Sequence, residues 1–259
     1  MPGRLEGKVA LVTGASSGLG KATALKFARE GAAVVVAARR SAETEATAQM
    51  IRDGGGRAIA VPTDVSCPGQ VEAMVATAVS TYGRLDLAFN NAGVFGPEGP
   101  IHEAPEEQWD SLIDINLKGT WLCMKYELPH MLAQGSGSIV NMASSAGLTG
   151  WSDGPLYSAS KHGVIGLTKS AALQYAPAGI RINVVCPAFT WIEAFGEILA
   201  ADPNADSPLK ATIPLGRIGQ MNEIAEAATW LGSDAASFCV GHALALDGGQ
   251  TIGLWHSES

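Results

Sequence analysis

The chain has 259 residues, of which 47% are apolar and 16% charged, and its formal net charge is −8. This composition is too apolar for a disordered protein. The negative charge argues against binding to nucleic acid, which proteins hold mainly through Lys and Arg, and against adhesion to anionic membranes. No apolar run reaches the roughly 20 residues of a membrane-spanning helix, and the first residues lack the apolar region of a signal peptide. We therefore expect a cytoplasmic protein that acts on small molecules.

Cysteine and histidine are scattered along the chain. The four cysteines form no C-x-x-C pair, and the five histidines show no regular spacing. Zinc sites and disulfide frameworks need patterned spacing, so we expect reduced, mostly buried thiols and no bound metal.

Short β-branched runs alternate with helical stretches along the whole chain. The expected strands lie at residues 8–14, 32–39, 57–64, 84–93, 137–145, 180–187 and 242–249. Strands that are apolar on both faces and alternate with helices are typical of a parallel sheet covered on both sides. Because no linker, repeat or low-complexity segment divides the chain, we expect one α/β domain over residues 1–259. It would be a doubly wound Rossmann-type domain with a seven-stranded sheet, and its ligand would lie beyond the carboxyl ends of the strands.

The first expected strand is followed by the sequence TGASSGLG, with glycines at Gly14, Gly18 and Gly20. A glycine-rich turn that leads into a helix lets the backbone approach a pyrophosphate, and the helix N-terminus offers free N–H groups to that anion. The alternative is a tight turn without a ligand, but its position at the start of such a fold favours a nucleotide. Lys21 is not followed by Ser or Thr, which disfavours a triphosphate hydrolase.

The end of the second expected strand bears on the choice of dinucleotide. NAD-binding folds usually place an acid there for the ribose hydroxyl, whereas this chain has Ala38, then Arg39 and Arg40. A guanidinium suits a 2′-phosphate, so we predict NADP in preference to NAD. The alternative is two solvated arginines at a helix start, and the uncharged Ser17 does not add a second cation.

The sequence YSASK places Tyr157 and Lys161 four residues apart, on one face of an expected helix. A nearby ammonium favours a phenolate, so we expect Lys161 to lower the pKa of Tyr157 and make it a general acid or base. Ser144 lies thirteen residues earlier, just past a strand, where its hydroxyl could hold a carbonyl oxygen. Taken alone, the Tyr–Lys pair could be a chance surface pair.

In a series of motifs the chain resembles the short-chain dehydrogenase/reductase family almost from end to end. The motifs are TGASSGLG at 13–20, Asp64 in TDV, NNAG at 90–93, Asn116 in INLKG, Ser144, YSASK at 157–161 and DGG at 247–249.

This resemblance implies a catalytic tetrad of Asn116, Ser144, Tyr157 and Lys161. Tyr157 would exchange a proton with the substrate oxygen, Ser144 would orient that oxygen, and Lys161 would also bond the nicotinamide ribose. Asn116 would connect a proton relay to solvent through ordered water. Together with the two arginines, the implied dinucleotide contacts are Gly14, Ser16, Ser17, Gly18, Leu19, Gly20, Arg39, Arg40, Asp64, Val65, Asn91, Ala92, Gly93, Tyr157, Lys161, Pro187 and Thr190.

One segment departs from the family pattern. Where relatives continue P-G-x-[VI]-x-T, this chain reads PAFTWI, with Ala188 in place of the glycine and Ile192 in place of the threonine. One side-chain hydrogen bond to the dinucleotide is therefore expected to be lost, although Thr190 could supply it from a shifted loop.

The segment from about 189 to 213 corresponds to the family's variable substrate lid. The apolar residues expected to wall a pocket there are Phe189, Trp191, Ile192, Phe195, Ile198 and Leu199, with Phe95, Leu148, Trp151 and Leu156 from elsewhere in the chain. They predict a moderately hydrophobic alcohol or ketone as substrate, not a phosphorylated sugar. Ordinary helix packing or a subunit contact remains the alternative.

The leading prediction is thus an oxidoreductase that moves hydride between NADP(H) or NAD(H) and a secondary alcohol or ketone. The alternative is a catalytically silent dinucleotide-binding sensor or scaffold. An epimerase or dehydratase would need a larger C-terminal region, and an enoyl reductase would have a wider Tyr–Lys spacing. The resemblance also implies a homotetramer, formed through helices at 106–134 and 157–177 and a contact near 242–253.

Overall fold

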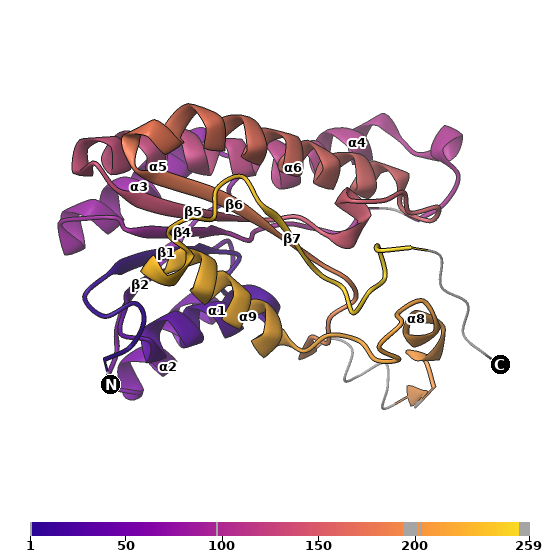
Figure 1. Ribbon diagram of the computed structural model, residues 1–259, viewed down its shortest axis with the longest axis horizontal. Coiled ribbons are helices and arrows are strands. Elements are labelled where there is room, and N and C mark those ends of the chain that lie inside the picture. Colours follow the sequence, from indigo (N-terminus) through magenta and orange to yellow (C-terminus); the bar gives the residue numbers. More distant parts are fainter. Residues whose placement is uncertain (1, 97, 194–200, 203, 254–259) are drawn as a thin grey trace.

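The computed structural model describes residues 2–96, 98–193, 201–202 and 204–253 (Figure 1). Across these residues a parallel sheet of seven strands, in the order β3-β2-β1-β4-β5-β6-β7, forms the middle layer. Its strands are β1 (Val9–Thr13), β2 (Ala33–Ala38), β3 (Arg57–Pro62), β4 (Leu87–Asn90), β5 (Gly137–Met142), β6 (Ile180–Pro187) and β7 (Ala243–Leu246). The strand order reverses between β1 and β4, which is the position where such sheets bind their ligands. The predicted Rossmann-type fold is confirmed.

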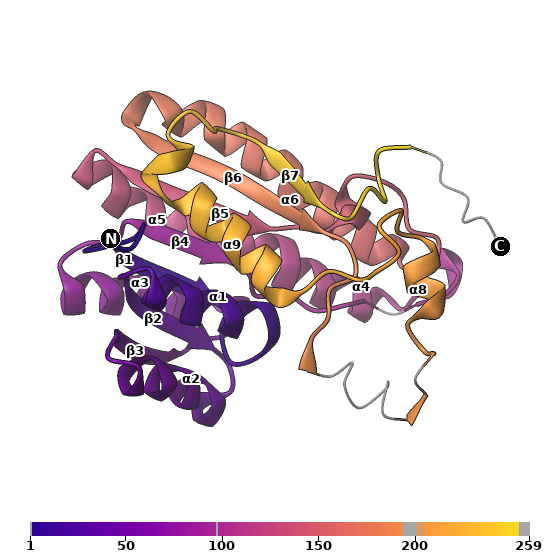
Figure 2. The ribbon, with the colours of Figure 1, turned by 60° about the horizontal axis from the view of Figure 1, so that its bottom comes forward.

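Helices cover both faces of the sheet (Figures 1 and 2). On one face lie α1 (Gly18–Arg29), α2 (Ser41–Asp53) and α9 (Met221–Gly232), and on the other α3 (Pro68–Tyr82), α5 (Gly119–Gln134) and α6 (Pro155–Tyr175). The shorter helices α4 (Glu106–Ile113) and α8 (Ser207–Ala211) lie beyond one end of the sheet. Local signals set several of these boundaries: Pro68 begins α3, Gly83 ends it with a positive φ of 79°, and a capping box of Gln220 and Glu223 begins α9.

The core is divided by the sheet into two layers. One packs against α1 and α9, and there Phe27 meets Phe89 edge to face at 6.3 Å. The other packs against α3 and α5. Every residue of β1 and β2 is buried, which explains why these strands are apolar at consecutive positions and do not alternate.

The expected long helix at 106–134 differs from prediction in one respect. A π-helical turn, η2 (Asp114–Lys118), separates α4 from α5, while the backbone stays helical through both junctions. A π turn inserts an extra residue into the helix and changes the direction of the side chains around it. Here it contains Asn116, whose side chain is completely buried. Helix α6 also begins two residues earlier than expected, because Pro155 occupies its first turn.

Candidate active site

A groove runs across the carboxyl ends of the strands and consists of two adjoining cavities. The larger has a volume of about 420 Å³ and the smaller about 270 Å³. Residues of the glycine-rich turn and of the segment after β4 line both cavities: Gly14, Ser17, Ala92, Gly93 and Val94. The groove therefore lies at the switch point between β1 and β4, where the topology predicts a ligand.

The glycine-rich turn lies close against the segment that follows β4. Gly14 has φ +66°, and a Cβ added there would lie 2.8 Å from Asn91 Nδ2 and 2.9 Å from the Ala92 Cα. Helix α1 begins at Gly18, and the N–H of Lys21 donates to the Ser17 carbonyl at 3.2 Å. The N–H groups that precede it in the first turn have no intrahelical acceptor, which makes them available to an anion. This turn fits the pyrophosphate of a dinucleotide.

Thr13, which sequence reasoning missed, joins these two segments. Its Oγ1 accepts hydrogen bonds from the backbone N–H groups of Asn91 and Ala92, each at 3.0 Å, and Asn91 Nδ2 donates to the Thr13 carbonyl at 3.0 Å. The available signal was a hydroxyl residue at the last position of the first strand, directly before the turn.

The smaller cavity contains the residues predicted to read the adenosine end of a dinucleotide. Arg39, Arg40, Asp64 and Val65 all line it. Arg40 Nη2 donates to Ser16 Oγ at 3.0 Å and to Ser17 Oγ at 2.8 Å, so its guanidinium lies over the glycine-rich turn.

Asp64 is fixed by a residue that the motif did not single out. Its Oδ1 accepts from the backbone N–H of Ser66 at 2.9 Å and from the Ser66 hydroxyl at 2.7 Å. Burial alone would raise the pKa of Asp64, but the hydrogen bonds from Ser66 and the charge of Arg39 outweigh it and lower that pKa. An ionised Asp64 is thereby held at the edge of the cavity.

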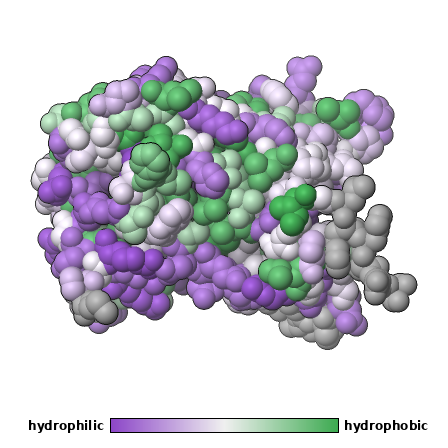
Figure 3. Space-filling model, in the orientation of Figure 1, coloured by the Kyte–Doolittle hydropathy of each residue, from purple (hydrophilic) through white to green (hydrophobic). Residues whose placement is uncertain are grey.

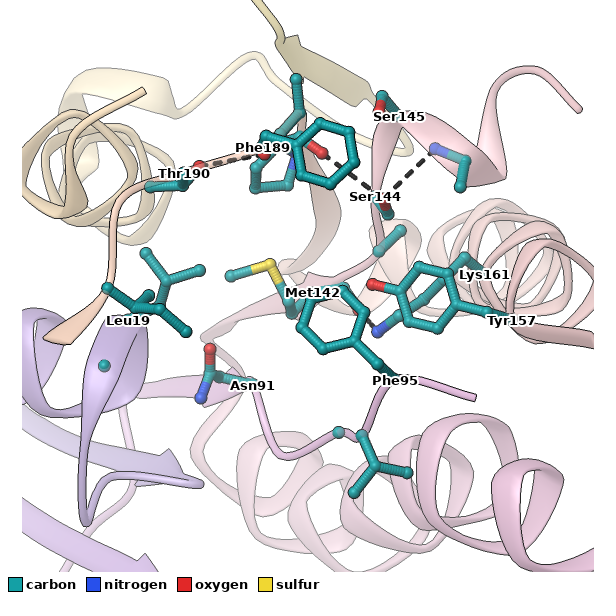
Figure 4. Close-up of a pocket in the computed structure, with 18 of the residues that line it drawn as sticks. Leu19, Asn91, Phe95, Met142, Ser144, Ser145, Tyr157, Lys161, Phe189 and Thr190 are labelled. Carbon is teal, nitrogen blue, oxygen red and sulfur yellow. Dashed lines mark hydrogen bonds between the residues drawn. The ribbon is translucent and has the colours of Figure 1, made fainter. Parts of the chain in front are cut away.

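The larger cavity contains the other predicted residues. Tyr157 and Lys161 reach it from α6, and Ser144 reaches it from the end of β5 (Figure 4). Ser144 Oγ accepts from the Ala146 N–H at 3.2 Å and donates to the Pro187 carbonyl at 3.5 Å. Lys161 is 3% exposed, its Nζ donates to the Met142 carbonyl at 3.1 Å, and it lies 5.4 Å from the centre of the Tyr157 ring.

The predicted sign of the Tyr157 pKa shift is wrong. Burial raises the pKa of Tyr157 to about 12, although a hydrogen bond with Ser144 acts in the opposite direction. Burial also lowers the pKa of Lys161 to about 8. A charge loses solvation when it is buried, and for Tyr157 this loss outweighs the opposing hydrogen bond with Ser144. The phenol thus holds its proton firmly.

Asn116 holds the segment after β4 against the π turn. Its Oδ1 accepts from the Val94 N–H at 2.8 Å, and its Nδ2 donates to the Val94 carbonyl at 2.9 Å and to Ser160 Oγ at 3.2 Å. Gly93 lies between this amide and the lysine, since a Cβ there would lie 3.1 Å from Asn116 Oδ1 and 3.4 Å from Lys161 Nζ. Asn116 and Lys161 therefore lie close together, as expected, and Gly93 places no side chain between them.

The altered segment after β6 is stabilised by its own backbone. Thr190 Oγ1 donates to the Ala188 carbonyl at 3.0 Å, and Thr190 forms a parallel bridge with Gly219. The Ala188 N–H donates to the Leu246 carbonyl at 3.2 Å. Thr190 and Pro187 both line the larger cavity, as predicted, but the Thr190 hydroxyl already has a backbone acceptor.

Part of the expected apolar wall is present. Phe95, Trp151, Phe189 and Ile192 line the larger cavity. Leu156 does not, because it is buried beneath Tyr157 beside Leu112. Leu148 and Trp191 are also absent from the described lining, whereas Phe195, Ile198 and Leu199 lie outside the described residues. Sequence reasoning missed Met142 and Gln250, which line the cavity from the end of β5 and from beyond β7.

Neither a metal site nor a membrane span is found in the ranges given above. No group of three or more His, Cys, Asp or Glu side chains there could hold a metal ion. No helix there is long and apolar enough to cross a bilayer.

A Rossmann-type sheet with a phosphate-binding turn and a Ser–Tyr–Lys cluster at one groove defines a dinucleotide-dependent oxidoreductase. A family model described as enoyl-(acyl carrier protein) reductase matches residues 14–251. The chain is 44% identical to a cis-4-hydroxycyclohexanecarboxylate dehydrogenase of Sinomonas cyclohexanicum, over 94% of this chain and 96% of that one. It is 43% identical to a cyclohexanol dehydrogenase of Acinetobacter sp. (strain SE19), over 97% and 98%. The chain belongs to the short-chain dehydrogenase/reductase family.

Solved structures agree with this assignment. An NAD⁺-bound xylitol dehydrogenase superposes with a TM-score of 0.89 at 32% identity, over 93% of this chain and 98% of that one. A protein of Beutenbergia cavernae described as an NAD(P)-dependent gluconate 5-dehydrogenase, with NADP bound, has a TM-score of 0.89 at 35% identity, over 98% and 100%. The protein is thus an oxidoreductase that uses a nicotinamide dinucleotide to interconvert an alcohol and a carbonyl compound.

Proposed function

We propose that this oxidoreductase interconverts a hydrophobic secondary alcohol and its ketone with NADP(H), and that Tyr157 exchanges the proton. The observation that carries the proposal is the convergence of Tyr157, Ser144 and Lys161 on one cavity that adjoins the phosphate-binding turn. When bound, the dinucleotide would supply or accept the hydride at the substrate carbon.

The side chains of the cavity each have a separate role in proton transfer. In reduction, the Tyr157 hydroxyl donates its proton to the carbonyl oxygen as negative charge develops there. Its raised pKa keeps that proton in place until the substrate oxygen becomes basic enough to take it. Ser144 orients the oxygen, and the Lys161 ammonium stabilises the phenolate that is left. Asn116 holds the segment after β4 and, through water, leads the proton to solvent. In oxidation the same groups act in reverse.

The preference for NADP rests on Arg40. It lies over Ser16 and Ser17 and lines the smaller cavity, and β2 ends at Ala38 without an acid that would repel a 2′-phosphate. An arginine is well suited to bind a phosphate with two parallel hydrogen bonds.

The cofactor proposal is tested by measuring kcat/KM with both dinucleotides. We expect higher kcat/KM with NADP(H), and Arg40→Ala should lower that value by roughly 10- to 100-fold with little change for NAD(H). Arg52→Ala, which removes a half-buried arginine at the far end of α2, is the matched control. A wild-type preference for NAD(H) would refute the assignment.

The substrate proposal rests on the apolar rings around the phenol and on the relative named for cyclohexanol. A screen of alcohols and ketones, followed through the absorbance of the reduced nicotinamide, tests it. We expect cyclohexanol and similar alcohols to be oxidised, and phosphorylated sugars to be inert. The comparisons give no support to a silent sensor or scaffold.

We also propose a cytoplasmic homotetramer of single-domain subunits, in which the segment at about 189–213 is the substrate lid. Trp121 and Leu132 on α5 and Leu173 on α6 are large apolar side chains that are exposed in the single chain. Figure 3 shows a second apolar area in the middle of its face, where β6 and β7 lie in Figure 1. Phe238 and Val240, just before β7, are exposed as well. Both surfaces would be covered in such an assembly.

A further inference from the structure

We propose that the larger cavity selects a neutral cyclic alcohol or ketone and rejects the same ring when it carries a carboxylate. The proposal rests on the proposed function and adds a substrate class to it. Its basis is the chemistry of the cavity wall, whose described residues offer apolar rings and no free cation.

The described wall of the larger cavity carries almost no charge. Among the described residues that line it, Lys161 is the one charged side chain. It is 3% exposed, and its Nζ already donates to the Met142 carbonyl. The sequence has no Lys, Arg or His between Arg181 and Lys210, and its charged residues there are all acidic, beginning with Glu193. The described wall of the larger cavity therefore offers no unpaired cation.

Aromatic rings surround the Tyr157 phenol. The Phe95 ring is stacked on the Tyr157 ring, with centroids 5.2 Å apart and an interplanar angle of 29°. Trp151 meets Tyr157 edge to face at 5.8 Å, and Phe189 meets Trp151 in the same way at 6.3 Å. Phe95, Trp151 and Phe189 come from three separate segments, and Figure 4 shows Phe95 and Phe189 on two sides of the space in front of the Tyr157 hydroxyl.

The aromatic rings and the lack of a free cation in the described wall both favour a neutral ring over a charged one. Flat apolar faces bind a saturated ring well because both exclude water. A carboxylate on that ring would lose its hydration without gaining an ionic partner, and burial of an unpaired charge is strongly unfavourable. We expect this cost of burying the carboxylate to lower kcat/KM for the anion by about 100-fold or more, relative to the neutral ring.

The test compares three substrates with the purified protein: cyclohexanol, cis-4-hydroxycyclohexanecarboxylate and its methyl ester. The ester keeps the size of the acid and lacks its charge. We expect the ester to be within about 10-fold of cyclohexanol in kcat/KM, and the acid to be at least about 100-fold below the ester. Equal turnover of acid and ester would overturn the inference and leave the proposed function standing. Turnover of no alcohol or ketone with either dinucleotide would overturn both.

A variant pair tests whether the wall is the cause. Phe95 is 69% exposed, so its replacement should not disturb folding. Phe95→Arg supplies a cation beside the ring site, and Phe95→Leu is the neutral control. We expect the acid-to-ester ratio of kcat/KM to be at least about 10-fold higher in Phe95→Arg than in Phe95→Leu. The same ratio in both variants would overturn the assignment of selectivity to this wall.

Discussion

Tyr157 shows how burial changes the chemistry of a single residue. Its spacing from Lys161 suggested a phenol that loses its proton easily, but the structure places the ring 8% exposed beneath Phe95 and Trp151. Burial raises its pKa to about 12. The phenol is therefore protonated near neutral pH, and in the proposed mechanism it becomes a phenolate only while Lys161 stabilises the charge.

Tyr157→Phe should abolish most of the activity. Removing a general acid costs roughly 100- to 10,000-fold in rate, so we expect kcat to fall by at least about 100-fold. The affinity for the dinucleotide, measured by titration of the intrinsic fluorescence, should stay within a few-fold, because the phenyl ring keeps the packing. Unchanged turnover in a correctly folded variant would refute the role assigned to Tyr157.

Glu127 is a second residue whose environment determines its protonation. It is fully buried on α5, and its Oε2 accepts from Asn90 Nδ2 at 3.1 Å. Within the described part of the chain, its other oxygen and the Asn90 carbonyl oxygen both lack a partner. Both atoms are acceptors, and an ionised carboxyl group has no proton to donate to an acceptor. Burial raises the pKa of Glu127 to about 8, which agrees with a protonated acid paired to the amide.

Glu127→Gln should change how stability depends on pH. The folded-state pKa lies above the ordinary value of 4.5, so the wild-type contribution is fully present below that value and is lost as pH rises to about 8. The slope in this window is about 1.4 kcal/mol per pH unit. Glutamine keeps an acceptor for Asn90 Nδ2 without titrating, so the variant should gain stability over wild type as pH rises. Denaturant unfolding between the two pKa values measures the free energy of unfolding of both proteins. Glu72→Gln, at an exposed position on α3, is the control. Parallel curves would contradict a buried acid.

At the scale of elements, strands were predicted better than helix boundaries. Strands such as β1 and β2 are buried on both faces, and this leaves a continuous apolar run in the sequence. The π turn η2 leaves no such signal. The pattern from 106 to 134 is helical throughout, and the extra residue is stabilised by contacts of Asn116 with Val94 and Ser160, which are distant in sequence.

The junction between β1 and β4 supplies a prediction at this scale. Thr13→Val keeps the shape of the side chain but leaves the Ala92 N–H without its acceptor, whereas the Asn91 N–H retains the Phe89 carbonyl. A buried donor without a partner costs about 1–3 kcal/mol, so we expect a lower free energy of unfolding and weaker dinucleotide binding. Thr229→Val is the control, since Thr229 is equally buried but donates within its own helix. A loss no greater than that of the control would show that the junction does not depend on Thr13.

At the scale of the whole molecule, the exposed apolar side chains of α5 and α6 favour self-association. Leu173 is 80% exposed on α6. We expect light scattering to give a mass about four times the 26.7 kDa of one chain, and Leu173→Glu to lower it, because a charge cannot be buried there without a partner. Met50→Glu, at an exposed apolar position on α2, should not. A monomeric wild type would refute the tetramer.

The candidate site was predictable where short motifs carry it. The glycine-rich turn, Ser144 and the Tyr–Lys pair were all found from spacing, and the structure brings them to one groove. Contacts between distant segments were not predicted from the sequence. Thr13 contacts Asn91, which lies 78 positions away in the chain. Met142 and Gln250 reach the cavity only because the fold places them there. Burial, which determines the pKa of Tyr157, is equally a property of the folded chain.

The cavity is lined by residues from Gly14 to Gln250, and the last strand, β7, forms one edge of the sheet. A growing polypeptide that has left the ribosome only as far as β6 would already have the phosphate-binding turn, the serine and the phenol. It would still lack the edge strand and the final part of the cavity wall. Activity should therefore appear only after β7 and Gln250 have left the ribosome, and a chain that has emerged only as far as β6 would not consume cofactor.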